Sequence, residues 1–421
     1  MSAGILAIGF TSCKDKEDDP KPTTPTASHV LTGEVSSDKA LAADSVWTLK
    51  GYVYVKSGAT LTIPAGTIIK SDVVDKGALI VEPGGKIMAE GTSSSPIVFT
   101  SGLPAGQRRA GDWGGIIILG KATTNRSSNP KIEGGVDRTY GGSDDADNSG
   151  TLKYVRIEFA GIAASPGSEI NGLTLGGVGS GTTIENVMVS YGNDDGFEFF
   201  GGTVNCKNLI AYACADDDFD FDFGYRGTIT GGISFKNPQI ADAADASNGV
   251  ECDNDGTGTS ATPYTHPKLI NFTFVGPNKA ANTQANHQYA LRFRRAARFT
   301  VENSILIGHQ KGGFSIESSG TLNDYKNGTS AFKNNLLLAT TDTYKGADAT
   351  ATADITAKAT ADGNVVLTDV AEAGLNEPFK IGSLNFGAKA GGMAATKGAG
   401  AITGTDWTSG WAEWDPNNKA Y

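Results

Sequence analysis

IENVMV at residues 184–189 and CKNLIA at residues 206–211 share one pattern: an apolar residue, any residue, Asn, and then a short, mainly apolar strand. The pattern recurs at residues 269–274 (LINFTF), 301–306 (VENSIL) and 332–337 (FKNNLL), and at residues 229–234 (ITGGIS) with Gly in the Asn place. Successive spacings are 22, 23, 40, 32 and 31 residues. A period of this size is typical of stacked supersecondary units. We therefore expect a solenoid whose longer repeats carry loop insertions.

A second strand pattern follows the Asn in each repeat and alternates apolar with polar residues, as in FEFF (197–200) and FDFDF (219–223). Alternation at period two sends every other side chain to the same side of a strand. The side chains expected in the interior are those of Phe197, Phe199, Phe219, Phe221, Phe223, Val250, Cys252, Leu291, Phe293, Phe314 and Ile316. The chain also holds 56 Gly among 421 residues, which indicates many tight turns.

These patterns predict an all-β protein: a single-stranded, right-handed parallel β-helix over residues 30–340. Each repeated Asn is expected at a bend, because Asn tolerates left-handed backbone geometry and its amide can bond to the coil above. Residues 341–421 are rich in Ala, Thr and Gly and are expected to form an irregular C-terminal cover. Within that cover we expect Trp407, Trp411 and Trp414 to cap the last open coil.

The N-terminal residues indicate targeting. An apolar stretch at residues 5–10 (ILAIGF) precedes Thr11-Ser12-Cys13, which resembles the lipobox of Bacteroidota lipoproteins. Residues 1–13 are therefore interpreted as a lipoprotein signal segment that ends in a lipidated Cys13. Residues 14–29 begin with charges and continue with Pro and Thr, so they are expected to form a solvated tether. This predicts a protein anchored by lipid in the outer membrane, at its extracellular face.

Several short motifs outside the repeat support a surface location. They are TIPAGT (62–67), GGKIMAEGT (84–92), PIVFT (96–100), DWGG (112–115), DDGFE (194–198), GGTV (201–204) and WTSGW (407–411). Together they resemble a family of right-handed parallel β-helix surface lipoproteins of Bacteroidota, over most of the chain from about residue 30 onward. The resemblance implies the fold and the location. It implies no agreed activity.

The outward positions of the second strand carry charges in successive repeats. The candidate ligand-binding residues are Glu198, Asp220, Asp222, Glu251, Asp253, Arg292 and Arg294. Neighbouring coils of a β-helix lie about 4.8 Å apart, so these side chains are expected to form one continuous charged face. Crowded carboxylates raise one another's pKa unless a cation compensates. Ca²⁺ is the expected cofactor, and its candidate ligands are Asp194, Asp195, Asp217 and Asp218.

The sequence is compatible with three functional hypotheses. The acids could only stiffen the turns; they could form a Ca²⁺-assisted face that binds polysaccharide; or they could belong to a polysaccharide lyase or glycoside hydrolase. No catalytic residue is identified, because the chain lacks a recognisable acid–base signature and its four His are isolated. A net charge of −11 argues against nucleic acid as a partner. We favour a non-catalytic surface protein that engages polysaccharide, with an adhesin or scaffold without a glycan ligand as a further alternative.

Overall fold

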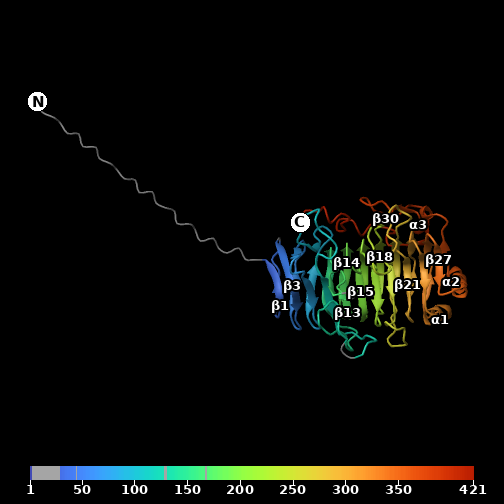
Figure 1. Ribbon diagram of the computed structural model, residues 1–421, viewed down its shortest axis with the longest axis horizontal. Coiled ribbons are helices and arrows are strands. Elements are labelled where there is room, and N and C mark those ends of the chain that lie inside the picture. The colour runs from blue at the N-terminus through green and yellow to red at the C-terminus, as the bar shows by residue number, and fades with distance from the viewer. Residues whose placement is uncertain (2–28, 44, 128–129, 166–167) are drawn as a thin grey trace.

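The computed structural model describes residue 1 and residues 29–43, 45–127, 130–165 and 168–421. Its main sheet has 26 strands, and the strands lie in successive layers along one axis from β1 to β27 (Figure 1). All the pairings within this sheet are parallel. The predicted parallel β-helix is confirmed. Cys13 and residues 14–28 lie outside the described residues.

The strands form three rows along the stack, which we call faces A, B and C. Face A contains the second half of β1 (Val30–Val35) and of β3 (Val46–Val55), then β6 (Ala78–Val81), β9 (Gly115–Leu119), β13 (Leu173–Val178), β15 (Phe197–Gly202), β17 (Phe219–Asp222), β19 (Val250–Cys252), β21 (Tyr289–Phe293), β24 (Gly312–Ile316) and β27 (Asp342–Gly346). Face B contains β2 (Lys39–Ala40), β4 (Thr60–Ile63), β7 (Lys86–Glu90), β22 (Thr300–Glu302) and β25 (Ala331–Lys333). Face C contains β5 (Ile68–Ser71), β8 (Ile97–Ser101), β23 (Ile305–Ile307), β26 (Leu336–Leu338) and β28 (Val365–Val366).

Five long strands pass from face B into face C through a bend. They are β10 (Gly150–Glu158), β14 (Thr183–Ser190), β16 (Cys206–Tyr212), β18 (Thr228–Phe235) and β20 (Lys268–Val275). The repeated Asn lies at this bend with a left-handed backbone, at φ +53° in Asn186 and +56° in Asn208. The Asn208 side-chain amide donates to Asn186 Oδ1 at 3.0 Å, so the predicted Asn ladder links these coils. Tyr154 occupies the same place in β10 at φ +50°, which the Asn pattern did not reveal.

The interior is filled by the inward side chains of face A and of the long strands. Phe197 stacks on Phe219, with ring centroids 5.1 Å apart, and both are fully buried. The predicted interior set is confirmed with one exception. Phe223 follows the end of β17 with φ +50°, and this left-handed residue breaks the alternation. Its ring therefore lies on the outside, where it stacks on Phe200 with centroids 5.6 Å apart.

The C-terminal region differs from the predicted irregular cover. β27 and β28 continue the parallel stack beyond residue 340, the limit that we expected. Between them lies α2 (Ala349–Ala361), whose buried Ile355 and Ala359 join the interior cluster and close the end of the stack. The other elements are α1 (Ser319–Asn327), a 3₁₀ turn η1 (Val370–Ala373), α3 (Met393–Lys397), and two antiparallel pairs, β11 (Ala163–Ser165) with β12 (Ser168–Glu169) and β29 (Leu375–Glu377) with β30 (Asn385–Ala388).

The last residues of the chain run back along face C toward the N-terminal coils (Figure 1). Trp411 packs edge-on against Tyr154, and Trp414 packs edge-on against Tyr212. The expectation that the tryptophans cap the last coil is therefore wrong: Trp411 and Trp414 cover outward apolar side chains in the middle of the stack, and α2 closes its end. Among the described residues, helices of the length and apolarity needed to cross a membrane are absent.

Candidate functional site

The outward side chains of face A form a ladder of charge across successive coils. Strand register places Glu198 opposite Asp220, Asp220 opposite Glu251, and Glu251 opposite Arg292. The coil before Glu198 contributes Thr174, and the coil after Arg292 contributes Ser315. A second row of outward side chains lies two residues further along these strands and consists of Asp222, Asp253 and Arg294. The structure thus brings the predicted ligand-binding residues together on one face.

The arginine end of the ladder is fully paired. Arg292 contacts Glu251 at 3.0 Å and Glu317 at 2.9 Å. Arg294 contacts Glu251 and binds Asp253 at 2.7 Å, and Arg295 reaches the same Asp253 oxygen at 2.6 Å. Burial opposes the charge on both Arg292 and Arg294, yet these carboxylates raise the pKa of both guanidinium groups. The two arginines are therefore held as cations by their partners.

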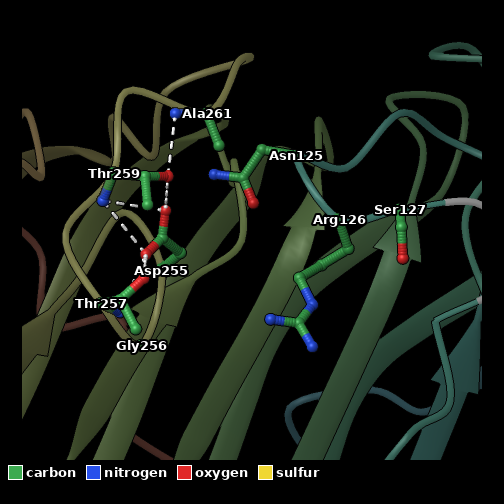
Figure 2. Close-up of a pocket in the computed structure, with 8 residues that line it drawn as sticks. All are labelled: Asn125, Arg126, Ser127, Asp255, Gly256, Thr257, Thr259 and Ala261. Carbon is green, nitrogen blue, oxygen red and sulfur yellow. Dashed lines mark hydrogen bonds between the residues drawn. The ribbon is translucent and has the colours of Figure 1, made fainter.

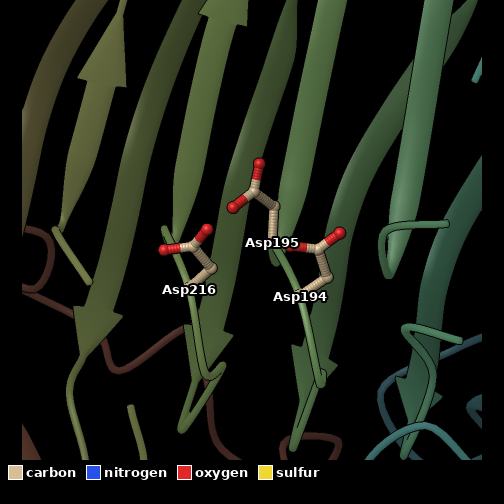
Figure 3. A group of neighbouring side chains, drawn as sticks. All are labelled: Asp194, Asp195 and Asp216. Carbon is tan, nitrogen blue, oxygen red and sulfur yellow. The ribbon is translucent and has the colours of Figure 1, made fainter. Parts of the chain in front are cut away.

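The other end of the ladder is a cluster of acids. Asp194, Asp195 and Asp216 lie in the turns that lead into β15 and β17, and each offers a carboxylate oxygen within 4.8 Å of the others (Figure 3). Asp195 also belongs to a second group at the same spacing, with Glu198 and Asp220. In the part of the chain that the structure describes, none of these five carboxylates forms an ion pair with a Lys or Arg side chain.

Burial and mutual repulsion raise the pKa of the cluster. Burial is the largest cause at each acid, followed at Asp194 by the charge of Glu133 and at Asp216 by the charge of Asp194, and it raises both pKa values to about 8. The pKa values of Asp195, Glu198 and Asp220 also lie well above the usual range, for the same two reasons. Such a cluster is stabilised either by protons or by a hard cation.

Two of the predicted metal ligands are placed differently from what we expected. Asp218 is completely buried and turned toward Lys236, whose ammonium lies 3.3 Å from Asp218 Oδ1. Asp217 accepts from the backbone N–H of Asn248 at 2.6 Å. Among the described residues, neither Asp217 nor Asp218 belongs to a carboxylate group with metal-ligand spacing, and Asp216 takes their place. The reason is that residues 216–218 lie in a bend before β17 begins at Phe219, so strand alternation does not apply to them.

Lys236 is a neighbour of the acidic cluster that the sequence did not reveal. It follows β18, is fully buried, and donates to the backbone carbonyls of Asp216 and Cys214 as well as to Asp218. Burial favours loss of its proton, but Asp218 and Asp217 outweigh burial and raise its pKa. Lys236 therefore fixes the turn that presents Asp216 and supplies one positive charge from behind the cluster.

A long loop between β9 and β10 borders the acidic cluster and was also not predicted. Its residues Ile132, Val136 and Tyr140 cover the outward apolar side chains of β6 and β9. The same loop brings Glu133 to Glu198, and the Asn171 side-chain amide donates to both carboxyl groups. Burial raises the pKa of Glu133 despite these hydrogen bonds. The loop covers the apolar outer part of face A, and the charged ladder begins beside it.

Family comparison agrees with the β-helix fold. A family model described as a pectate-lyase-like β-helix domain matches residues 33–412. The chain belongs to this family. Searches found no match among curated proteins and none among solved structures. The family fits a function related to polysaccharide, and the finer assignments rest on the site itself.

Proposed function

We propose that this protein is a lipid-anchored cell-surface protein that binds acidic polysaccharide through a Ca²⁺-dependent face A. The observation that carries the proposal is the cluster of Asp194, Asp195, Asp216, Glu198 and Asp220, which has no ion-pair partner among the described residues. Membership of a pectate-lyase-like family supports a glycan as the ligand.

A bound cation would favour the approach of such a ligand. The protein carries a net charge of −11, and a polysaccharide with carboxylates would be repelled by an ionised acidic cluster. Ca²⁺ prefers carboxylate oxygens and takes roughly 6–8 ligands. Three protein carboxylates would leave several positions for water and for a sugar carboxylate. Asp195 belongs to both carboxylate groups, so we expect it to contribute most to cation binding.

Binding is favoured over lyase chemistry by the state of the arginines. A lyase needs a base that removes a proton from the sugar ring, and Arg292 or Arg294 would have to be neutral to act in this way. Both are instead held as cations by Glu251, Glu317 and Asp253. Their raised pKa values oppose the loss of a proton.

Glycoside hydrolysis is the second candidate, and the contact between Glu133 and Glu198 favours it. A hydrolase needs one carboxyl group that keeps its proton near neutral pH and one that is ionised. Burial raises the pKa of both groups, and the neighbouring Glu133 raises that of Glu198 further. This pair supplies a protonated acid. Asp220 lies in the next coil, but burial raises its pKa as well, so Asp220 does not supply the ionised partner.

One screen separates these functions. Purified protein is tested against acidic and neutral polysaccharides with Ca²⁺ and with chelator, and both binding and new product ends are measured. Ca²⁺-dependent binding of an acidic polysaccharide without products is the expected result, and Asp195→Asn abolishes it. Glu377→Gln, an exposed acid in the C-terminal region, is the matched control. Products that vanish in Asp220→Ala would identify an enzyme, and silence in every assay would favour a scaffold.

The lipid anchor is tested separately. Palmitate labelling of the wild type and of Cys13→Ala, combined with protease treatment of whole cells, measures lipidation and surface display. We expect label only in the wild type and digestion of the intact protein at the surface. Label that persists in Cys13→Ala, or complete protection from protease, would contradict the proposal.

A further inference from the structure

A polar cleft of about 380 Å³ lies at the end of face A opposite to the aspartate turns. Asn125 and Arg126 from the β9–β10 loop line one side (Figure 2). Asp255, Thr257 and Thr259 from the β19–β20 connection line the other side. The cleft therefore lies between two loops that are far apart in the sequence and project from the same side of the stack (Figure 1).

Hydrogen bonds hold both walls of the cleft in place. Asp255 accepts from the backbone N–H groups of Thr257 at 2.8 Å and of Thr259 at 3.1 Å, and from both threonine hydroxyls. Burial opposes ionisation of Asp255, but these bonds outweigh it and lower its pKa to about 2. The Asn125 amide donates to the Asn254 carbonyl at 2.7 Å and so ties one wall to the other. The cleft is thus formed before any ligand arrives.

Arg126 gives one side of the cleft a positive charge. Its guanidinium lies over the Phe223 ring, 4.3 Å from the centroid, and the Asn125 backbone N–H donates to the Phe223 carbonyl at 2.9 Å. Among the described residues, Arg126 forms no ion pair, whereas Arg292, Arg294, Arg295 and Arg298 each contact at least one carboxylate. An exposed guanidinium that lies over a ring and has no carboxylate partner is well placed to bind a planar carboxylate.

The cleft and the acidic cluster lie at opposite ends of the same strand. Asp216 precedes β17, and Phe223, on which Arg126 stacks, follows it. At about 3.3 Å per residue, the path from Asp216 to Phe223 is roughly 20 Å long. Asp220 and Asp222 point outward along this path. A ligand that contacts both ends would therefore be a chain of several sugar units that runs along the strands.

We propose that the Arg126 cleft is a second subsite that binds the carboxylate of a uronic acid unit. Arg126 would pair with the carboxylate. On the other wall the hydroxyl protons of Thr257 and Thr259 bind Asp255, so the two hydroxyl oxygens would accept hydrogen bonds from the sugar hydroxyls. A uronic acid presents both kinds of group on one ring, which matches a cleft with one cationic and one hydrogen-bonding wall. The inference rests on the proposed function and narrows its ligand to polysaccharides that contain uronic acid.

The test compares polygalacturonate with its carboxyl-reduced, neutral form, at saturating Ca²⁺. Affinities are measured for the wild type, Arg126→Ala, Arg126→Lys and Lys397→Ala, the last being an exposed cation in α3 that serves as a charge-matched control. We expect Arg126→Ala to weaken binding of polygalacturonate by at least about tenfold, since a hydrogen-bonded charge pair is lost. Arg126→Lys should retain part of the affinity, because it keeps the charge but loses the planar pairing.

The outcomes separate the subsite from the proposed function. The subsite is supported if Arg126→Ala loses affinity for polygalacturonate while Lys397→Ala keeps it, and if neither substitution changes the affinity for the neutral polymer. An unchanged affinity in Arg126→Ala, with binding lost in Asp195→Asn, would overturn the subsite and leave the proposed function in place. A wild type that binds no polygalacturonate would overturn both. Arg126 is exposed, so thermal unfolding of the variant should match the wild type.

Discussion

The carboxylates at face A fall into two groups that differ in their partners. Glu251 and Asp253 are paired with arginines, and Asp218 is paired with the buried Lys236. Asp194, Asp195 and Asp216 lie in the neighbouring turns and, among the described residues, have no cationic side chain in an ion pair. Both groups come from the same kind of strand and turn. A group of carboxylates is therefore not by itself a candidate binding site. The candidate site is the group of carboxylates that has no cationic side chain in an ion pair.

The largest effect should come from removal of the internal cation. Lys236→Met leaves Asp218 buried without its partner, and breaking a buried pair in this way costs about 3–5 kcal/mol of the free energy of unfolding. Denaturant unfolding measures the loss. Lys236→Met combined with Asp218→Leu should recover most of it, since an apolar pair of similar volume replaces the ion pair. If Lys236→Met were as stable as the wild type, the ion pair between Lys236 and Asp218 would not stabilise the fold.

The fold could be predicted from the sequence because its signals are local and repeat. Asn186 and Asn208 lie one short coil apart, and each bend needs only one residue that tolerates φ near +55°. Alternation likewise placed Phe197 and Phe199 in the interior. The prediction was wrong at Phe223, where the strand had already ended and period two no longer held.

The site was predicted less completely because its partners come from distant, non-repeating segments. Glu133 and Arg126 belong to the β9–β10 loop, and nothing in their sequence context shows which coil that loop reaches. Asp216, Asp217 and Asp218 are identical residues in succession, so only the turn geometry decides that Asp216 joins the cluster and that Asp218 meets Lys236. The alternation of apolar and charged residues predicts which charges lie on face A. It does not predict which cationic side chains pair with them.

The uncompensated group should make stability depend on pH. Burial and neighbouring carboxylates raise the pKa values of Asp194 and Asp216 from an ordinary value of 3.8 to about 8 in the folded protein. Between these values the folded state holds more protons than the unfolded state, so the free energy of unfolding falls as pH rises. Without divalent cations we expect the free energy of unfolding to fall between about pH 5 and pH 8. Thermal scans with chelator measure it, and Ca²⁺ should abolish the loss at about pH 8. Equal stability at both pH values would place these acids with the compensated group.

Asp195→Asn should convert the cluster toward a compensated state. In the wild type the Asp217 backbone N–H donates to Asp195 Oδ1 at 2.8 Å, and the amide oxygen of Asn can accept the same hydrogen bond. The substitution therefore removes one buried charge and keeps this contact. In the presence of chelator at about pH 8, we expect a gain of about 1–2 kcal/mol over the wild type. Titration calorimetry should detect Ca²⁺ binding by the wild type and by Glu377→Gln but not by Asp195→Asn. Retained Ca²⁺ heat in Asp195→Asn would show that the cation binds elsewhere.

The smallest effect should come from Arg294→Gln, which moves part of the compensated group toward the uncompensated one. Arg294 contacts both Glu251 and Asp253, but Arg292 still lies 3.0 Å from Glu251 and Arg295 still lies 2.6 Å from Asp253. Because partners remain, we expect a loss of only about 1 kcal/mol in the presence of chelator. The variant also leaves one more negative charge in excess beside Asp220, so Ca²⁺ should raise its melting temperature by more than it raises that of the wild type. A loss as large as that of Lys236→Met would mean that Arg294 alone compensates these acids. An unchanged response to Ca²⁺ would mean that the two groups of carboxylates act independently along the face.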